Sequence, residues 1–366
     1  MRFILTLVSA LLASAVVRLG CAEVLARTDS PGAIAHAAEL EGRLNAARLM
    51  DLAGAADVNG DSRALLRQAL AANPRDVSAW SALGLAAERA GDFAAAEHAL
   101  LQAARLDRRY LPAWTLANYY FRRGERDPFW MWARRAARMA YDDFPPLFRL
   151  GDVFEPDAAR VLDRLGGDAR MTGAYVTYLA GEAHRLDAAE LAARRLLALP
   201  AAGDRPIVMN LITREIAANR MRPALELWNA VFTPLDPSRG PVLTNGVFNE
   251  KPSGEGFDWR MPTCEGAVSQ WRPGRLFFDL TGRQSDVAIL LERPIPTVRG
   301  RRYRLHFESV SPSTPRWEWD GLPSADDSFS ATRDALVQLR LVCRRTPGAV
   351  PFEGRIEIRN LSIEVE

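Results

Sequence analysis

The sequence predicts two unlike parts, a stack of helical repeats followed by an antiparallel β-sandwich. Apolar residues recur every three or four positions from about 30 to 232, which is the period of packed helices. Aromatic residues recur at a fixed spacing of 34 residues within that region. After a connection rich in proline and glycine, apolar and polar residues alternate through residues 247–366, which is typical of strands with one buried face.

The composition is that of an ordinary folded protein. Of the 366 residues, 48% are hydrophobic and 25% are charged, which excludes intrinsic disorder and a polytopic membrane protein. The 47 basic and 45 acidic residues nearly cancel, and this balance argues against nucleic acid as a partner. Lys251 is the only lysine, so arginine supplies the other positive charges. We attribute this bias to codon usage rather than to chemistry.

Residues 1–26 have the pattern of a signal peptide or N-terminal membrane anchor. Met1 and Arg2 precede a 15-residue apolar run at 3–17. A membrane span needs about 20 apolar residues, and the run approaches that length only by including Arg18 and continuing to Ala26. We therefore expect export to the bacterial cell envelope, with the segment cleaved, or retained in the inner membrane. Leu19-Gly20-Cys21 also resembles the end of a lipoprotein signal, which would lipidate Cys21, although Arg18 replaces the usual aliphatic residue.

Residues 30–232 are predicted to form a helical repeat domain. Trp80, Trp114 and Phe148 lie 34 residues apart, and we expect each to begin a helical pair. In the most regular unit, the residues after Trp80 that share the repeat pattern are Leu83-Gly84, Gly91-Asp92, Ala96, Leu100 and Ala103. This pattern resembles the tetratricopeptide repeat. Gly84 and the alanines would let two antiparallel helices approach closely.

The tetratricopeptide resemblance is strongest over 62–140. A preceding unit at 43–76 keeps Leu66, Ala69 and Pro74, and the unit at 111–144 keeps Trp114 and Ala137. Two more degenerate units are marked by Ala180-Gly181 and Leu227-Trp228. Because at least three stacked pairs bury a continuous core, we expect a right-handed solenoid.

The resemblance implies a concave groove, formed by the first helices, that holds a segment of a protein partner. The expected lining is Ser78, Ser81, Leu85 and Arg89 in one unit and Thr115, Tyr119, Arg122 and Arg123 in the next. Arg89, Tyr119, Arg122 and Arg123 are the candidate protein-binding residues, because arginines can clamp a carboxylate and an aromatic ring can stack on an extended peptide. The alternative is a solvated arginine face beside core aromatic residues.

Residues 233–246 carry three prolines and two glycines and are expected to form a linker. Beyond it, alternating segments begin near 275, 286, 301, 335 and 355, and each is predicted to be a strand of the β-sandwich domain at 247–366.

Short motifs in this part resemble jelly-roll carbohydrate-binding modules and galactose-binding-like domains. Residues 245–248, Asn-Gly-Val-Phe, match an opening strand, while Gly300 and Gly354 precede a central and a closing strand. Asn249 and Asn360 replace acidic residues, which argues against the structural calcium site of many relatives. The resemblance implies glycan as a second class of partner.

A glycan platform needs exposed aromatic rings beside polar groups. Trp317, Trp319 and Asp320 are the best candidates, followed by Trp259 and Trp271. The alternative is that these tryptophans pack inside the sandwich or dock it on the solenoid. A second hypothesis is a glycan-active enzyme that uses paired carboxylates, with Glu292, Glu308, Glu318 and Asp320 as candidates.

The sequence carries no strong motif for catalysis or for a cofactor. It has no G-x-S-x-G, no P-loop, no G-x-G-x-x-G after a strand and no H-E-x-x-H. The four histidines lack ligand spacing, so we expect no metal and no cofactor. In an oxidising compartment Cys264 and Cys343 can form a disulfide, the alternative being two separate buried thiols. We therefore expect a non-catalytic envelope adaptor that binds protein through its groove and glycan or protein through its sandwich, by analogy in polysaccharide assembly or export.

Overall fold

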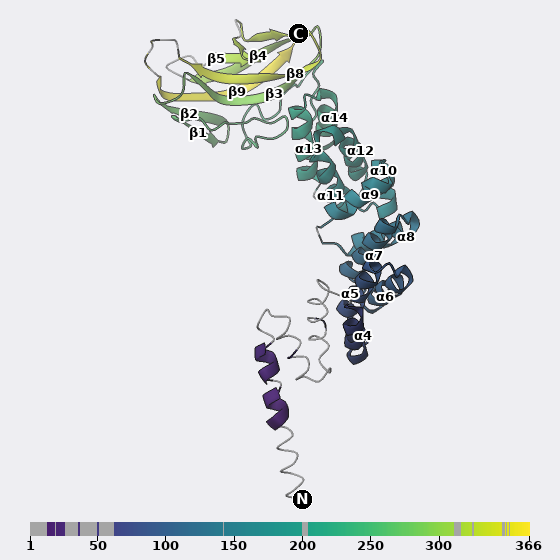
Figure 1. The fold of residues 1–366 in the computed structure, drawn as a ribbon. Helices are drawn as coiled ribbons and strands as arrows, with labels where there is room; N and C mark the ends of the chain where they lie inside the picture. The colour runs from purple at the N-terminus through teal and green to yellow at the C-terminus, as the bar shows by residue number, and fades with distance from the viewer. Residues whose placement is uncertain are drawn as a thin grey trace, which may run out of the picture. The chain divides into compact units, whose positions relative to one another are not determined.

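The computed structural model describes residues 13–18, 20–25, 36, 50, 62–141, 143–199, 204–310, 316–323, 326–345, 348, 350 and 352–366. Figure 1 shows labelled helices through position 231 and strands from position 267, which confirms the predicted fold class. The chain divides into two compact units. Of the described residues, the first unit holds those up to Pro156 and Asp163–Gly166, and the second holds Asp157–Leu162 and Gly167–Glu366.

The first unit is a series of helix pairs. Its helices are α4 (Arg63–Ala72), α5 (Val77–Arg89), α6 (Phe93–Leu106), α7 (Tyr110–Arg123), α8 (Arg126–Met139) and α9 (Pro145–Phe154). Asp76 and Asp92 begin α5 and α6 by accepting hydrogen bonds from backbone N–H groups three residues later. Gly124 ends α7 in the left-handed conformation, with φ of 71°. The pairs α5–α6 and α7–α8 confirm the predicted repeat over this region.

Helices α5 and α6 pack as closely as the sequence predicts. A Cβ atom placed on Gly84 would lie 2.6 Å from Leu100 Cγ. Leu100 is itself buried, as are Ala96 and Ala103. A side chain at position 84 would therefore have to displace a core leucine.

The second unit begins with more helices. They are α11 (Ala169–Ala180), the short η1 (Ala183–Arg185), α12 (Leu186–Leu197), α13 (Arg205–Ala217) and α14 (Met221–Val231), while α10 (Ala158–Leu165) contributes residues to both units. Helix α11 packs on α12, and α13 packs on α14. The degenerate repeats expected near 180 and 228 are thus helical pairs.

Part of the expected N-terminal signal or anchor is described. Residues 13–18 and 20–25 are helical, and Val16, Val17 and Val24 are exposed. The rest of 1–26, and most of the first helix expected at 43–76, lie outside the described residues. Within the described part of the chain, no helix has the length and apolar character needed to cross a membrane.

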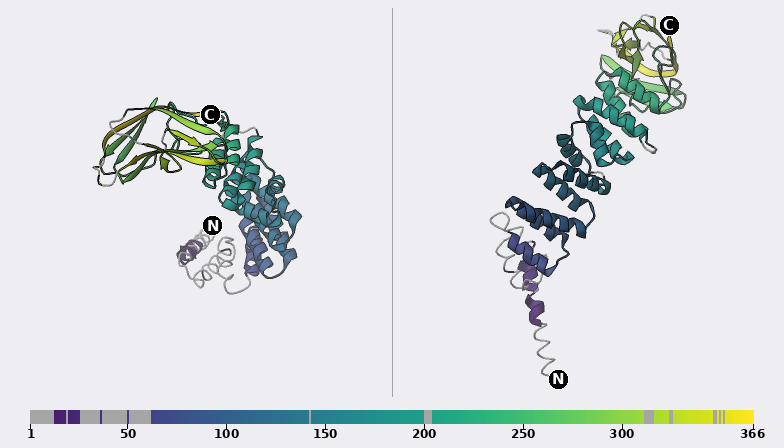
Figure 2. Two further views of the ribbon diagram at one scale, coloured as in Figure 1. Left: turned by 90° about the horizontal axis from the view of Figure 1, so that it is seen from above. Right: turned by 90° about the vertical axis from the view of Figure 1, so that its right-hand side faces the viewer.

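The strands of the second unit form two antiparallel sheets. They are β1 (Ala267–Arg272), β2 (Arg275–Thr281), β3 (Val287–Thr297), β4 (Arg302–Val310), β5 (Arg316–Trp319), β6 (Leu322–Pro323), β7 (Ser328–Ser330), β8 (Ala335–Arg344) and β9 (Glu353–Val365). The sheet orders are β1-β2-β9-β4-β7 and β3-β8-β5-β6. The two sheets lie face to face (Figure 2) over a shared core that includes Phe278, Leu291, Leu341 and Ile356.

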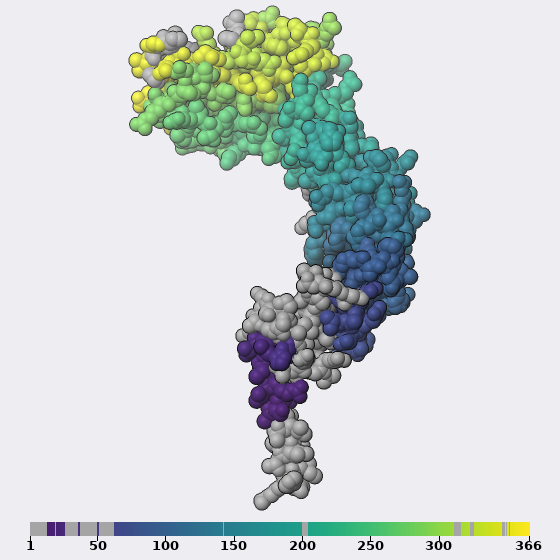
Figure 3. All heavy atoms as spheres, viewed as in Figure 1, coloured from purple at the N-terminus to yellow at the C-terminus, as the bar shows by residue number. Residues whose placement is uncertain are grey.

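The strand pairing brings the start and end of the β region together. Leu276 lies opposite Ile358, and Phe278 lies opposite Ile356, so β2 and β9 are neighbours. Figure 3 shows the resulting surface, on which the green atoms of the early strands adjoin the yellow atoms of the last residues. Along β4, Tyr303 and Leu305 are buried while the alternate residues are not, as the sequence pattern predicts.

The predicted opening strand at 245–248 is wrong. These residues form a turn, with φ of 52° at both Asn245 and Phe248. The Gly246 carbonyl accepts a hydrogen bond of 2.8 Å from the Leu361 N–H. A Cβ atom on Gly246 would lie 1.9 Å from the Leu361 oxygen, so this close approach requires glycine. The Asn-Gly pattern marks a tight contact rather than a strand.

The segment 233–246 has no helix or strand, but it is packed rather than loose. Leu235 and Val242 are both buried. Tyr303 donates a hydrogen bond of 2.7 Å to the Pro237 carbonyl, and Arg293 donates one of 2.9 Å to the Thr244 carbonyl. These contacts fasten the expected linker to the sheets.

The last helices and the sheets belong to one unit. The ring of Phe257 meets Trp228 of α14 edge-on, with centroids 5.6 Å apart. The Gly256 N–H donates to the Thr213 hydroxyl at 3.0 Å. Because these contacts join α13 and α14 to the sheets, the boundary between compact units falls at 157–167, earlier than the connection that we expected at 233–246.

Candidate protein-binding surface

The first helices of two successive pairs present equivalent side chains, 34 residues apart. We call this surface the first-helix face and define it by Ser81, Leu85, Glu88, Arg89, Thr115, Arg122 and Arg123. Spacings of four, seven and eight residues place such side chains on one side of a helix. The Ser81 and Thr115 hydroxyls both donate 2.9 Å hydrogen bonds to the carbonyl four residues earlier, so the two helices match in local detail.

An ion pair joins the two helices across this face. Arg122 donates from Nε to Glu88 Oε1 at 2.8 Å and from Nη2 to Glu88 Oε2 at 2.7 Å. Hydrogen bonding to Glu88 raises the pKa of Arg122 above its usual range. Because the bidentate pair engages its guanidinium fork, Arg122 would have to give up Glu88 to clamp a partner's carboxylate in the same way. The expected binding role of Arg122 stays a prediction.

Tyr119 is a core residue rather than a groove residue. Its side chain is 2% exposed, and its hydroxyl donates a 3.0 Å hydrogen bond to the Phe93 carbonyl. Its ring meets Tyr120 edge-on, with centroids 5.1 Å apart. Burial raises the pKa of Tyr119. The ring fills the contact between α7 and α6, so the expected stacking on a peptide is wrong.

Arg89 and Arg123 remain at the surface. Arg89 is exposed at the end of α5. The guanidinium carbon of Arg123 lies 4.0 Å from the centroid of the Phe93 ring, and its Nε lies 3.4 Å from a Glu125 oxygen. The Arg123 side chain is still 36% exposed, and Phe93 is 40% exposed. This part of the face offers a cation held over an accessible aromatic ring.

The two tryptophans predicted to form a glycan platform are buried. Trp317 and Trp319 are each 2% exposed. Trp319 stacks on Phe329 with centroids 5.4 Å apart, and Trp317 meets Phe307 edge-on. Both tryptophans lie on β5, which pairs with β8 and β6, so their alternation turns both rings into the core. Asp320 is exposed, but its carboxylate accepts a 2.8 Å hydrogen bond from the Gln338 N–H.

The two further tryptophans also have structural roles. Trp259 is buried between the sheets, and Trp271 donates its indole N–H to the Phe248 carbonyl at 2.9 Å. The alternative of tryptophans packed in the sandwich is the correct one.

The carboxylates proposed for glycoside hydrolysis are engaged in local pairs. Glu318 is buried and accepts two hydrogen bonds from Arg344 Nη2. Glu292 lies 3.2 Å from Arg340 Nε, and Glu308 accepts a 2.8 Å hydrogen bond from Asn360. These partners account for the three carboxylates without a substrate.

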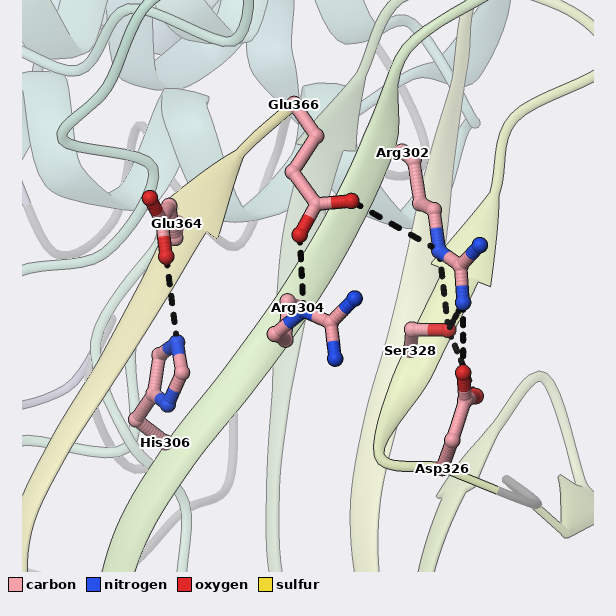
Figure 4. Close-up of polar contacts among 7 residues, drawn as sticks. All are labelled: Arg302, Arg304, His306, Asp326, Ser328, Glu364 and Glu366. Carbon is pink, nitrogen blue, oxygen red and sulfur yellow. Dashed lines mark hydrogen bonds and ion pairs between the residues drawn. The ribbon is translucent and has the colours of Figure 1, made fainter.

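The outer side of the five-stranded sheet carries a ladder of polar contacts (Figure 4). Arg304 donates to Glu366 at 2.7 Å, and His306 Nε2 lies 3.3 Å from Glu364. Arg302 contacts both Asp326 and Ser328. Sequence analysis did not single out this ladder, although basic residues on β4 and acidic residues at the end of the chain alternate with apolar ones. Because opposite charges pair across neighbouring strands, the ladder stabilises the sheet. This structural role accounts for the charged residues on the outer side of the sheet.

Cys264 and Cys343 are free thiols in the structure, each partly exposed. Cys343 lies opposite Ala288 in the β3–β8 pair. Cys264 lies opposite Ala267 in an isolated antiparallel backbone pairing outside the named strands. Burial raises the pKa of the Cys343 thiol, and the nearby Cys264 adds to the rise. Their pairing as a disulfide stays a prediction.

The known proteins to which this chain is similar were found by their solved structures, not by sequence family. No known family matches the chain, and no curated protein matches it. YrrB, described as a TPR protein with an unusual peptide-binding site, is 14% identical over 55% of this chain and 91% of its own, with a TM-score of 0.29. MamA is 18% identical over 50% and 92%, with a TM-score of 0.31. Tom70 from yeast is 16% identical over 54% of this chain and 45% of its own, with a TM-score of 0.33.

Proposed function

We propose that this protein is a non-catalytic scaffold whose first-helix face holds a segment of a partner protein. The observation that supports this most is the repetition of accessible side chains at equivalent positions of α5 and α7. Arg89 and Arg123 lie 34 residues apart and are both at the surface. The bidentate pair between Glu88 and Arg122 joins the two helices that carry them. A surface held rigid before binding loses less entropy when the partner arrives.

The chemistry of the face suits an extended segment with a carboxylate beside an apolar side chain. The guanidinium groups of Arg89 and Arg123 can donate to carboxylates. Apolar surface lies beside these cations, because Phe93 is partly exposed under Arg123 and the half-buried Leu85 is one helical turn before Arg89 on α5. Glycan binding is not part of the proposal, because the tryptophans that would form its platform are buried.

We also propose that the protein works in the bacterial cell envelope after export, which rests on the pattern of residues 1–26. N-terminal sequencing of protein from an envelope fraction tests this. A new N-terminus between about 16 and 23, after the small residues at 13–15 or 20–22, would indicate cleavage, and an intact N-terminus in the inner membrane would indicate an anchor. Recovery of the full chain from the cytoplasm alone would contradict export.

Charge reversal tests the binding face. The double variant Arg89→Glu/Arg123→Glu should lose capture of the partners that the immobilised wild-type chain retains from an envelope extract. Arg67→Glu/Arg138→Glu is the matched control, since both arginines are exposed in the same unit but lie outside the face. Each exposed charge contributes about 0 to 1 kcal/mol to stability, so the thermal midpoints should stay close. Equal capture by both variants would contradict the proposed face.

A further inference from the structure

A second candidate site lies on the other helices of the same two pairs. A cavity of about 530 Å³ lies between α6 and α8 and is lined by Leu101, Ala104, Arg105, Arg108, Trp132 and Arg135. We call it the second-helix pocket. It shares no residue with the first-helix face. Since a water molecule occupies about 30 Å³ in the liquid, the cavity has room for groups the size of side chains.

Three cations line this pocket without opposite charges to balance them. Among the residues that the structure describes, no carboxylate forms an ion pair with Arg105, Arg108 or Arg135. Two other arginines of this unit do have carboxylate partners, since Arg122 pairs with Glu88 and Arg109 pairs with Asp107. Like charges that line one cavity repel each other and create a positive potential there. The pocket therefore favours a negatively charged occupant.

Trp132 orients one of the arginines. Its side chain is 7% exposed, and within the described part of the chain its buried indole N–H has no hydrogen-bond partner. The guanidinium carbon of Arg135 lies 5.0 Å from the centroid of a Trp132 ring, so cation–π attraction holds this cation over the indole. The charged side chains of the wall are arginines, which can only donate hydrogen bonds, and they lie beside the apolar Leu101 and Ala104.

We propose that the second-helix pocket binds an acidic segment of a protein, with carboxylates on its arginines and an apolar side chain against Leu101 and Ala104. A lone phosphate ion would leave the apolar wall unused. The three arginines also come from three places, Arg105 on α6, Arg108 in the connection to α7 and Arg135 on α8, which suits several separate carboxylates. This site does not depend on the proposed function of the first-helix face.

The probe for the test is a fluorescein-labelled peptide, Glu-Glu-Leu-Glu-Glu-Phe-Glu-Glu with blocked ends, measured with the full chain by fluorescence anisotropy. Charge-assisted hydrogen bonds are strong, so Arg105→Ala/Arg135→Ala should weaken binding by about tenfold or more. The charge-matched control Arg67→Ala/Arg138→Ala should change it by less than about twofold. Arg89→Glu/Arg123→Glu should leave it unchanged, so failure of this site and failure of the first-helix face are distinguishable.

Several outcomes would overturn the proposal. The proposal would be wrong if Arg105→Ala/Arg135→Ala bound the peptide as tightly as the wild type. It would also be wrong if Arg67→Ala/Arg138→Ala weakened binding equally, or if Arg89→Glu/Arg123→Glu lost binding. Equal binding of a peptide with glutamine in place of glutamate would show that carboxylates are not recognised. Displacement of the probe by an equal concentration of inorganic phosphate would reassign the pocket to phosphate. If circular dichroism shows that the double variant is unfolded, Arg108→Ala, which lies outside the helices, provides the same test.

Discussion

Replacing Glu215 with glutamine should remove much of the pH dependence of the second unit's stability. Glu215 lies on α13 and is 0% exposed. Arg220 Nε lies 3.0 Å from one of its oxygens, but neither carboxylate oxygen has a hydrogen bond of good geometry among the described residues. Burial raises the pKa of Glu215 to about 7, and the negative charges of Glu190 and Asp187 add to the rise against the opposing effect of Arg220.

The direction of the effect follows from proton binding. An unfolded glutamate has a pKa near 4.5, so between that value and about 7 the folded state holds more protons than the unfolded state. The free energy of unfolding is therefore highest at low pH and falls as the pH rises through this window. Each pKa unit corresponds to about 1.4 kcal/mol, so the loss from pH 4.5 to pH 8 is about 3 kcal/mol.

The assay is urea unfolding of both proteins between pH 5 and pH 8, followed by far-UV circular dichroism. Glutamine keeps the shape of glutamate but does not ionise, so Glu215→Gln should gain stability over the wild type as the pH rises. Arg220 keeps Asp187 and Glu190 as partners in the variant. The control is Glu226→Gln, which removes a partly exposed carboxylate paired with Arg194 and should leave the pH dependence close to that of the wild type. Parallel pH profiles for wild type and Glu215→Gln would refute the reasoning.

Three further predictions concern packing and the thiols. Gly84→Ala should lower the free energy of unfolding by about 1 to 3 kcal/mol despite the better helix propensity of alanine, because the new methyl group meets Leu100; a stabilised variant in urea would contradict this. Gly246→Ala should prevent the second unit from adopting its native packing, since the methyl group would meet the Leu361 carbonyl, and unchanged near-UV circular dichroism would contradict it. In protein isolated from the envelope, Cys264 and Cys343 should be joined in a disulfide that adds about 4 kcal/mol to the free energy of unfolding. Mass spectrometry that finds both thiols alkylated without prior reduction would contradict this prediction.

The helix pairs could be predicted because their signals are local and repeated. The spacing of Trp80, Trp114 and Phe148 follows from one structural unit repeated along the chain, and Gly84 opposite Leu100 follows from close helix packing. The five long strands were equally visible as alternating segments. The strands β1, β5, β6 and β7 were missed. The extended form of β5 and β7 depends on partner strands that are distant in sequence, and β6 is only two residues long.

The functional residues were harder to predict because burial depends on tertiary contacts. Alternation places Trp317 and Trp319 on the same side of a strand, but it does not say which side faces the core. Tyr119 has helical spacing with the surface residues Arg122 and Arg123, yet its ring turns toward α6. The pair of Glu88 and Arg122 did have a signal, since opposite charges occupy equivalent positions one repeat apart. The second-helix pocket had none, because its arginines come from three segments.

Site-specific photo-crosslinking tests the central claim most directly, because it reports contact at a chosen residue in the living cell. A photoreactive amino acid would replace Thr115 on the first-helix face and, as control, Leu191, which is exposed on α12. The proposed function predicts a protein adduct from position 115, none from position 191, and loss of the adduct when Arg89→Glu and Arg123→Glu are added. An adduct at position 191 alone, or one at 115 that survives both charge reversals, would contradict binding through the first-helix face.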